Sequence, residues 1–153
     1  MTPISDVLQP DHVNLALSAR SRTEAVEAVM SKLNGDPRVT NFAQLEEAVR
    51  SRNAPAISEN GWGICLAHGR TDSVTELVMA AGRVTPGFTC RDVKEPVRLV
   101  FVAGIPSAFD SEYLRIVGVI ARICRDRHQF ERLLAAKTPE DFIHLLGAAE
   151  VKL

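Results

Sequence analysis

A run of apolar, mostly β-branched or aromatic residues between Val97 and Ala103 most strongly limits the folds open to this chain. Pro96 precedes the run, and Gly104 and Pro106 follow it closely. A nearly continuous apolar segment of this length, bounded by proline and glycine, is typical of a strand buried on both faces. Such a strand needs a covering layer on each side of its sheet, and the rest of the sequence has to supply both layers.

Helical patterns flank this strand on both sides along the chain. The expected helices cover residues 21–33, 41–52, 111–126, 129–136 and 138–146. Candidate N-caps for three of them are Ser21 or Thr23, Asn41, and Thr138, and Gly147 is expected to end the last. Further strands are expected at 13–17, 62–67 and 74–84. Strands between two groups of helices predict an α/β layered fold, in one domain spanning residues 1–153.

Composition excludes several classes of protein. The chain has 153 residues, 46% of them apolar, and a net charge of −1, so no global positive charge favours nucleic acid. Cys65, Cys90 and Cys124 are far apart and lack metal-ligand spacing, which favours reduced, packed thiols and no metal. No signal peptide is visible, and the apolar run at 97–105 is too short to span a bilayer. We expect a cytoplasmic protein without a cofactor or membrane insertion.

His68 is the residue best placed for chemistry. It directly follows the apolar segment 62–67, and we expect the stretch 68–72 to be a polar break after that strand. Strand ends in α/β sheets commonly present functional side chains. Gly69 would let the backbone turn and leave room for a partner, and Arg70 adds a cation. A histidine can accept a phosphoryl group as a nucleophile, although a loop histidine without a chemical role remains the alternative.

The string Gly61–Val74, GWGICLAHGRTDSV, resembles the enzyme IIA domains of the phosphotransferase system of the fructose/mannitol type, which include the nitrogen-regulatory phosphocarriers. The hallmark of that family is a glycine-flanked strand ending in Ile-Pro-His-Gly. The resemblance extends over nearly the whole chain, including the strand ending at 100–106, the helix from Ser111 and the closing segment 138–146. It implies the mannitol-type enzyme IIA fold, a single domain with a mixed β-sheet flanked by helices on both faces.

The resemblance implies a phosphotransferase activity through a phosphohistidine. His68 would accept a phosphoryl group at Nε2 from an HPr-type carrier protein or its nitrogen-branch counterpart. It would pass the group to a sugar-transporter B domain, or its phosphorylation state would signal to a regulatory target. Arg52 stands where the family keeps an arginine that could bind phosphoryl oxygens. Ser58, Gly69 and Arg70 complete the expected phosphoryl-binding set.

Several positions depart from the family pattern. Ala67 replaces a proline before the histidine, and Ile57 and Glu59 are unlike the family's site rim. Tyr113 stands where phosphorylating members carry a second, assisting histidine. A tyrosine can donate one hydrogen bond but cannot become cationic. A degenerate, non-phosphorylated module that binds a protein partner or an anionic ligand is therefore the alternative. The sequence names no sugar, target or oligomeric state, and the histidines at 12, 128 and 144 are expected to be structural or solvated.

Overall fold

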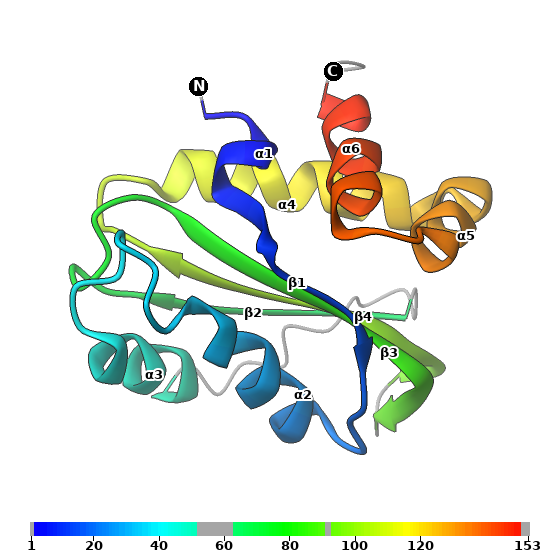
Figure 1. Ribbon diagram of the computed structural model, residues 1–153, viewed down its shortest axis with the longest axis horizontal. Coiled ribbons are helices and arrows are strands. Elements are labelled where there is room, and N and C mark those ends of the chain that lie inside the picture. The colour runs from blue at the N-terminus through cyan, green and yellow to red at the C-terminus, as the bar shows by residue number, and fades with distance from the viewer. Residues whose placement is uncertain (1, 52–62, 91–92, 151–153) are drawn as a thin grey trace.

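The computed structural model describes residues 2–51, 63–90 and 93–150 of the chain. Its sheet has four strands, namely β1 (Leu8–Leu17), β2 (Ile64–Arg70), β3 (Val78–Cys90) and β4 (Val93–Ile105). The helices are α1 (Ile4–Val7), α2 (Arg22–Met30), α3 (Phe42–Ser51), α4 (Asp110–Arg125), α5 (Arg127–Ala135) and α6 (Pro139–Glu150), and a 3-10 turn, Ser31–Leu33, follows α2. Figure 1 shows α2 and α3 on one side of the sheet and α1, α4, α5 and α6 on the other.

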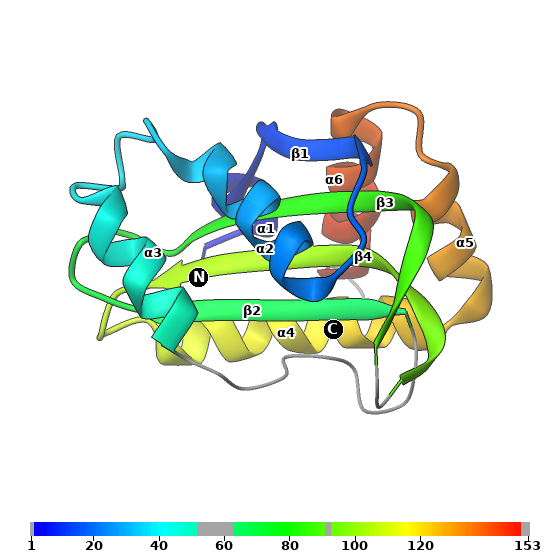
Figure 2. The same cartoon turned by 90° about the horizontal axis from the view of Figure 1, so that it is seen from below.

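The sheet is mixed, with the strand order β1-β3-β4-β2. β3 runs antiparallel to β4, whereas β1 is parallel to β3 and β2 is parallel to β4. Figure 2 shows β2 at one edge, with α3 in front of it and α4 behind it. The prediction of a mixed sheet flanked by helices on both faces is confirmed.

Strand β4 is the buried central strand that its apolar run predicts. Leu99 and Phe101 point into the core on the α4 side, whereas Val100 and Val102 point into the core on the α2 side. The alternation follows from the pleat, which sends successive side chains to opposite faces. β4 thus contributes side chains to both apolar cores. The helices on each side of the sheet bury their apolar side chains in the core on that side.

Side-chain caps fix where three of the helices begin. Ser21, Asn41 and Thr138 each accept a hydrogen bond from the backbone amide three residues further on, at 3.2, 3.2 and 3.1 Å. Each bond satisfies one of the amides that the first turn of a helix leaves without an intrahelical partner. The predicted N-caps Asn41 and Thr138 are therefore confirmed, and Ser21, not Thr23, caps the first of the three helices.

Strand β2 is longer than its sequence predicts. The expected polar break after Ala67 is wrong, because the strand continues through His68 to Arg70. Gly69 pairs with Gly104 of β4, and Arg70 pairs with Ile105. The polar residues His68 to Arg70 remain in the strand because they pair with β4, a long strand. Local sequence cannot reveal that pairing. His68 consequently lies within a strand and not in a loop.

The last helix is also longer than expected. α6 does not end at Gly147 but runs to Glu150. Ala149 is buried in the core, and the Glu150 carboxylate accepts hydrogen bonds from the Ile4 amide at 3.0 and 3.1 Å. Arg115 of α4 also donates to Glu150, at 2.7 Å. These contacts with α1 and α4 stabilise the final turn, and α1 itself was not predicted.

His12 of β1 is buried, and its Nε2 lies 3.6 Å from a carboxylate oxygen of Asp36. Desolvation lowers the pKa of His12, although the nearby Asp36 charge opposes that effect. Arg38 donates to both carboxylate oxygens of Asp36, and these hydrogen bonds keep the pKa of Asp36 below its usual value. The histidines at positions 128 and 144 are exposed.

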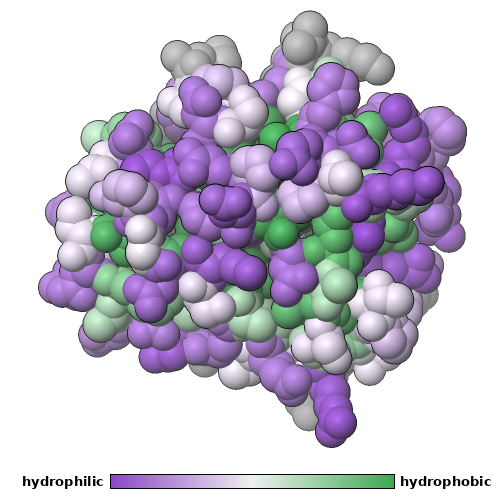
Figure 3. Space-filling view, in the orientation of Figure 1, coloured by the Kyte–Doolittle hydropathy of each residue, from purple (hydrophilic) through white to green (hydrophobic). Residues whose placement is uncertain are grey.

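The surface seen in Figure 3 carries polar and apolar residues side by side, without one continuous apolar face. Within residues 2–51, 63–90 and 93–150, none of the helices combines the length and the apolar character needed to cross a bilayer.

Candidate functional site

His68 lies near the carboxyl end of β2, at the edge of the sheet. Its half-buried imidazole is on the α4 side, the side on which Ile64 of the same strand also packs. Its neighbour across the sheet is Ala103 of β4, a small residue. The imidazole is therefore held between an edge strand and the start of a helix.

Tyr113 of α4 contacts this imidazole directly. Its hydroxyl oxygen lies 3.3 Å from Nδ1 of His68, and the two ring centroids are 5.0 Å apart with the rings tilted by 44°. The tyrosine is itself buried, with 9% of its surface exposed. At 3.3 Å the hydrogen bond is at the long end of the usual range, so it is a weak one. Because Nδ1 faces the helix, Nε2 is the ring nitrogen on the side away from Tyr113.

A second contact ties the same strand to the same helix. Residues two apart on a strand share a face, so Arg70 points to the α4 side as His68 does. Its guanidinium lies 2.6 Å from a carboxylate oxygen of Asp110, the first residue of α4. Asp110 and Tyr113 are one helical turn apart. The pairs His68–Tyr113 and Arg70–Asp110 therefore form two adjacent cross-links between β2 and α4.

The Arg70–Asp110 ion pair is half-exposed, with 50% and 47% of the two side chains accessible. Exposed pairs of this kind contribute only about 0–1 kcal/mol, so either partner can exchange its contact at little cost. The sequence analysis did not identify Asp110 as a site residue. An acidic residue at the start of the helix after the central strand was the available signal.

The segment after β2 is fastened to the segment after β4. The Thr71 amide donates to the Ile105 carbonyl at 3.0 Å, and the Ser107 hydroxyl donates to Asp72 at 3.1 Å. The hydroxyl groups of Thr71 and Ser73 lie 2.9 Å apart. The bonds from Thr71 to Ile105 and from Ser107 to Asp72 hold the end of β2 against the segment that leads into α4, the helix that carries Tyr113.

Gly69 has a different role from the one expected. It does not have a positive φ, and it lies within the strand, so the expected sharp turn is wrong. A Cβ at this position would lie 2.6 Å from the Val49 amide nitrogen and 2.8 Å from the Ala48 carbonyl carbon. The room beside Gly69 is therefore filled by the backbone of α3 and is not open to a partner. Glycine is needed there because α3 packs directly on β2.

Arg52 and Ser58 lie outside the described residues, as do Ile57 and Glu59 on the expected rim. Arg52 follows directly on Ser51, the last residue of α3. Its predicted phosphoryl contact and that of Ser58 stay predictions.

Metal-binding groups do not cluster in the part of the chain that the structure describes, where no three His, Cys, Asp or Glu side chains come together. Cys65 and Cys124 are buried, each in a different one of the two cores. Burial raises the pKa of Cys124 to about 12, so this thiol is protonated at neutral pH.

Comparison with known proteins gives a consistent result. The chain is 25% identical over 142 residues to the "PTS system fructose-specific EIIA component" of Haloferax volcanii, which covers 92% of each chain. The crystal structure of the nitrogen regulatory protein IIA-Ntr from Neisseria meningitidis has the same fold, with a TM-score of 0.78 and 21% identity over 94% of this chain and 98% of that one. Enzyme IIAMTL in a complex with phosphorylated enzyme IIBMTL from Escherichia coli gives a TM-score of 0.70 at 19% identity, over 90% and 95% of the two chains.

The family model "Phosphoenolpyruvate-dependent sugar phosphotransferase system, EIIA 2" matches residues 6–148. This match begins within α1, covers all four strands and the helices α2 to α5, and ends within α6. The chain thus belongs to the EIIA 2 family of the phosphoenolpyruvate-dependent sugar phosphotransferase system.

Proposed function

We propose that the protein is a phosphocarrier or phosphorylation-dependent regulator whose His68 accepts a phosphoryl group at Nε2 from an HPr-type carrier protein. The contact between the Tyr113 hydroxyl and His68 Nδ1, at 3.3 Å, is the observation that carries this proposal. It engages Nδ1 on the helix side, which favours Nε2 as the attacking nitrogen. Membership of the EIIA 2 family supports the same assignment.

The proposed transfer has a definite proton arrangement. The Nδ1–H of neutral His68 donates to the Tyr113 hydroxyl oxygen, so the lone pair is on Nε2. Nε2 attacks the phosphorus atom of the carrier's phosphohistidine. As the new N–P bond forms, the bond between phosphorus and the carrier's nitrogen breaks, and that nitrogen keeps the electron pair. The ring proton stays on Nδ1, where Tyr113 continues to accept it.

Charge stabilisation is the other requirement of phosphoryl transfer, because the chemistry depends mainly on positioning and on charge. Arg70 is on the same face of β2 as His68, and its pairing with Asp110 is half-exposed. The guanidinium can exchange that carboxylate for phosphoryl oxygens at little cost. Arg52, the residue that follows Ser51 in the sequence, is proposed as the second cation.

The test is phosphorylation of the purified chain with phosphoenolpyruvate, enzyme I and several HPr homologues. We expect an acid-labile label on His68, with nitrogen-15 NMR assigning the phosphorus to Nε2. A Tyr113→Phe variant removes only the hydroxyl, and we expect its labelling rate to fall by about two- to tenfold, the range of one hydrogen bond.

Two controls make the result decisive. His68→Ala should carry no label, whereas His144→Ala, which alters an exposed histidine, should be labelled at the wild-type rate. Absence of label on the wild type with every carrier homologue, or equal labelling of His68→Ala, would refute the proposal. Phosphorus on Nδ1 would refute the proton arrangement.

The contact made by Tyr113 also favours a second candidate function. A phenol stays neutral where an imidazole could become cationic, so the site has one fewer potential positive charge beside His68. On this reading the protein is a non-phosphorylated module that binds a protein partner or an anionic ligand on the His68 face. Labelling of Tyr113→His but not of the wild type is the result that distinguishes this function from the first. If the protein is instead a phosphocarrier, we propose that phosphorylated His68 passes its phosphoryl group to a transporter B domain or signals to a regulatory target.

A further inference from the structure

A pocket, called here the hairpin pocket, lies between the hairpin of β3 and β4 and the end of α5, with a volume of about 370 Å³. Figure 2 shows α5 at the same end of the sheet as this hairpin. The volume lies within the range of small-molecule sites, which begins near 300 Å³. Arg98 of β4 lines the pocket, five positions before Ala103, the strand partner of His68. The hairpin pocket is therefore about 17 Å along the sheet from the proposed phosphorylation site.

Arg98 supplies a positive charge that the described part of the chain leaves unmatched. The residue is half-buried, and its guanidinium makes no hydrogen bond or ion pair with any described residue. A Cβ at Gly87 of β3 would lie 3.1 Å from the Cγ of Arg98 and 2.7 Å from the Val97 carbonyl oxygen. Glycine at position 87 thus leaves the room that the Arg98 side chain fills beside β3.

Arg83 of β3 adds a second positive charge to the same lining. Its guanidinium donates to backbone carbonyls only, those of Leu15, Leu133, Leu134 and Ala136, at 2.7–3.2 Å. Desolvation lowers the pKa of Arg83, and no carboxylate among the described residues opposes that effect. The neutral acceptors hold this guanidinium in place without matching its charge. The described residues that line the pocket include two arginines and neither Asp nor Glu, so the lining favours an anion.

Much of the remaining lining is apolar and accessible. Pro86 of β3, Pro96 of β4 and Leu134 of α5 belong to it. Pro86 is exposed, and Pro96 and Leu134 are half-buried. A ligand in the hairpin pocket can therefore cover apolar surface that now faces water, and this favours an anion that carries an apolar body.

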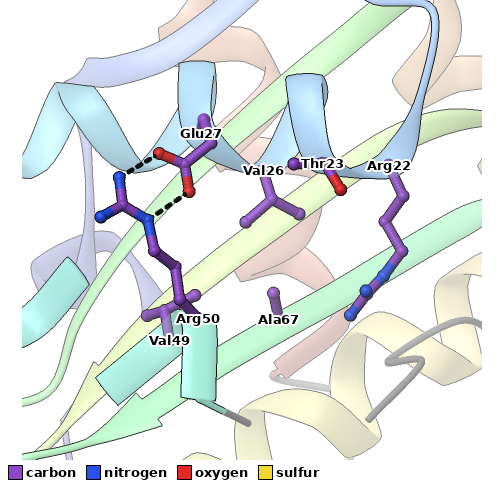
Figure 4. Close-up of a pocket in the computed structure, with 7 residues that line it drawn as sticks. All are labelled: Arg22, Thr23, Val26, Glu27, Val49, Arg50 and Ala67. Carbon is purple, nitrogen blue, oxygen red and sulfur yellow. Dashed lines mark hydrogen bonds and ion pairs between the residues drawn. The ribbon is translucent and has the colours of Figure 1, made fainter. Parts of the chain in front are cut away.

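The pocket between α2 and α3 differs in both respects. Figure 4 shows Arg50 donating to both carboxylate oxygens of Glu27, at 2.5 and 2.9 Å, so these two charges match each other. Its three apolar side chains are only 5–8% exposed, namely Val26, Val49 and Ala67. The hairpin pocket has the unmatched charge and the accessible apolar surface that an organic anion requires.

We propose that the hairpin pocket binds a small phosphate monoester, with its phosphate at Arg83 and Arg98 and its apolar body on the proline and leucine side chains. A phosphate monoester carries nearly two negative charges at neutral pH, which match two guanidinium groups. Guanidinium N–H groups also suit the geometry of phosphate oxygens. A carboxylate matches only one of the two charges, and inorganic phosphate leaves the apolar surface uncovered. Binding here does not depend on the proposed phosphorylation of His68.

The experiment is a titration of the purified chain with phenyl phosphate, followed by calorimetry and by methyl and amide NMR. We expect saturable shifts of the Leu134 methyl groups and the Gly87 amide, and the same shifts in His68→Ala. Inorganic phosphate lacks the apolar body and benzoate lacks the second charge, so each should bind at least about tenfold more weakly. A ligand that shifts the His68 ring but neither Leu134 nor Gly87 would overturn the proposal.

Variants at two arginines supply the matched control. Arg98→Gln removes one charged hydrogen-bond partner and should weaken binding of phenyl phosphate by about tenfold or more. Arg98→Lys keeps the charge but not the paired N–H groups, so its affinity should lie between the two, and it replaces Arg98→Gln if that variant folds poorly. Arg132→Gln removes an exposed arginine of α5 that does not line the pocket and should leave the affinity unchanged. Failure of phenyl phosphate to bind, equally tight binding of inorganic phosphate or benzoate, or equal behaviour of the variants at 98 and 132 would each overturn the proposal.

Discussion

Replacing Gly69 with alanine should weaken the contact between α3 and β2 and destabilise the protein. The added Cβ would lie 2.6 Å from the Val49 amide nitrogen and 2.8 Å from the Ala48 carbonyl carbon. Ordinary contacts of a Cβ begin near 3.4 Å, so α3 has to move away from β2 by about 3.4 − 2.6 = 0.8 Å. Both atoms belong to the backbone of a helix, and no side-chain rotation can relieve the overlap.

Overpacking of this kind costs about 1–3 kcal/mol. We expect a loss near the middle of that range, about 2 kcal/mol, in the free energy of unfolding. For a chain of this length each kcal/mol lowers the melting temperature by about 2–4 °C, which gives an expected decrease of about 4–8 °C. The slope of the free energy against urea concentration should not change, because the unfolded chain exposes the same surface.

The assay is urea unfolding followed by far-ultraviolet circular dichroism, with Gly118→Ala as the matched control. Gly118 lies in α4, is exposed, and a Cβ there would meet no atom within 4 Å. Alanine is the better helix former, so Gly118→Ala should stabilise the protein by up to about 1 kcal/mol. An unfolding midpoint for Gly69→Ala equal to or above that of the wild type would refute the reasoning, and so would an equal loss in both variants.

Three further perturbations test other parts of the fold. Because desolvation lowers the pKa of His12 in the folded state, its unfolded form binds more protons. The free energy of unfolding should therefore fall as the pH is lowered through about 6.5, the ordinary histidine pKa. His12→Gln should flatten that dependence. Iodoacetamide at pH 8 should alkylate Cys124 at least about a hundredfold more slowly in the native than in the unfolded chain, as peptide mass spectrometry would reveal, because burial raises its pKa to about 12. Arg83 donates to three carbonyls at the end of α5, at 2.7–3.2 Å. Arg83→Met should lower the free energy of unfolding by about 2–4 kcal/mol in urea, more than Arg83→Lys does.

The predictable part of this fold is the part with local causes. The apolar run in β4 and the N-caps at Ser21, Asn41 and Thr138 act within a few residues, and all are found as expected. The end of β2 was mispredicted because it depends on pairing with β4, which lies more than thirty positions further along the chain. Whether His68, Gly69 and Arg70 are part of a strand therefore depends on their pairing with β4 and not on their own sequence.

The candidate site divides in the same way. His68 is recognisable from its own neighbours in the sequence, and the resemblance to a family pointed to Tyr113, 45 positions away. The ion pair between Arg70 and Asp110 joins residues 40 positions apart. An acidic residue at a helix start marks Asp110 in the sequence, but nothing local pairs it with Arg70. Gly69 was identified correctly as special but for the wrong reason. Its neighbour is the backbone of α3, and only the packing of that helix shows why a side chain does not fit.

The contact between Tyr113 and His68 also bears on how such a site can diverge. Tyrosine and histidine codons differ only at their first base, so a single transition mutation exchanges a phenol for an imidazole. Position 113 lies in the early part of α4, and the buried side chains of Ile116, Val119 and Ile120 hold this helix on the sheet independently of the ring at 113. The acid–base character beside His68 is therefore open to drift and reversion within a lineage, while the backbone that presents the histidine is inherited unchanged.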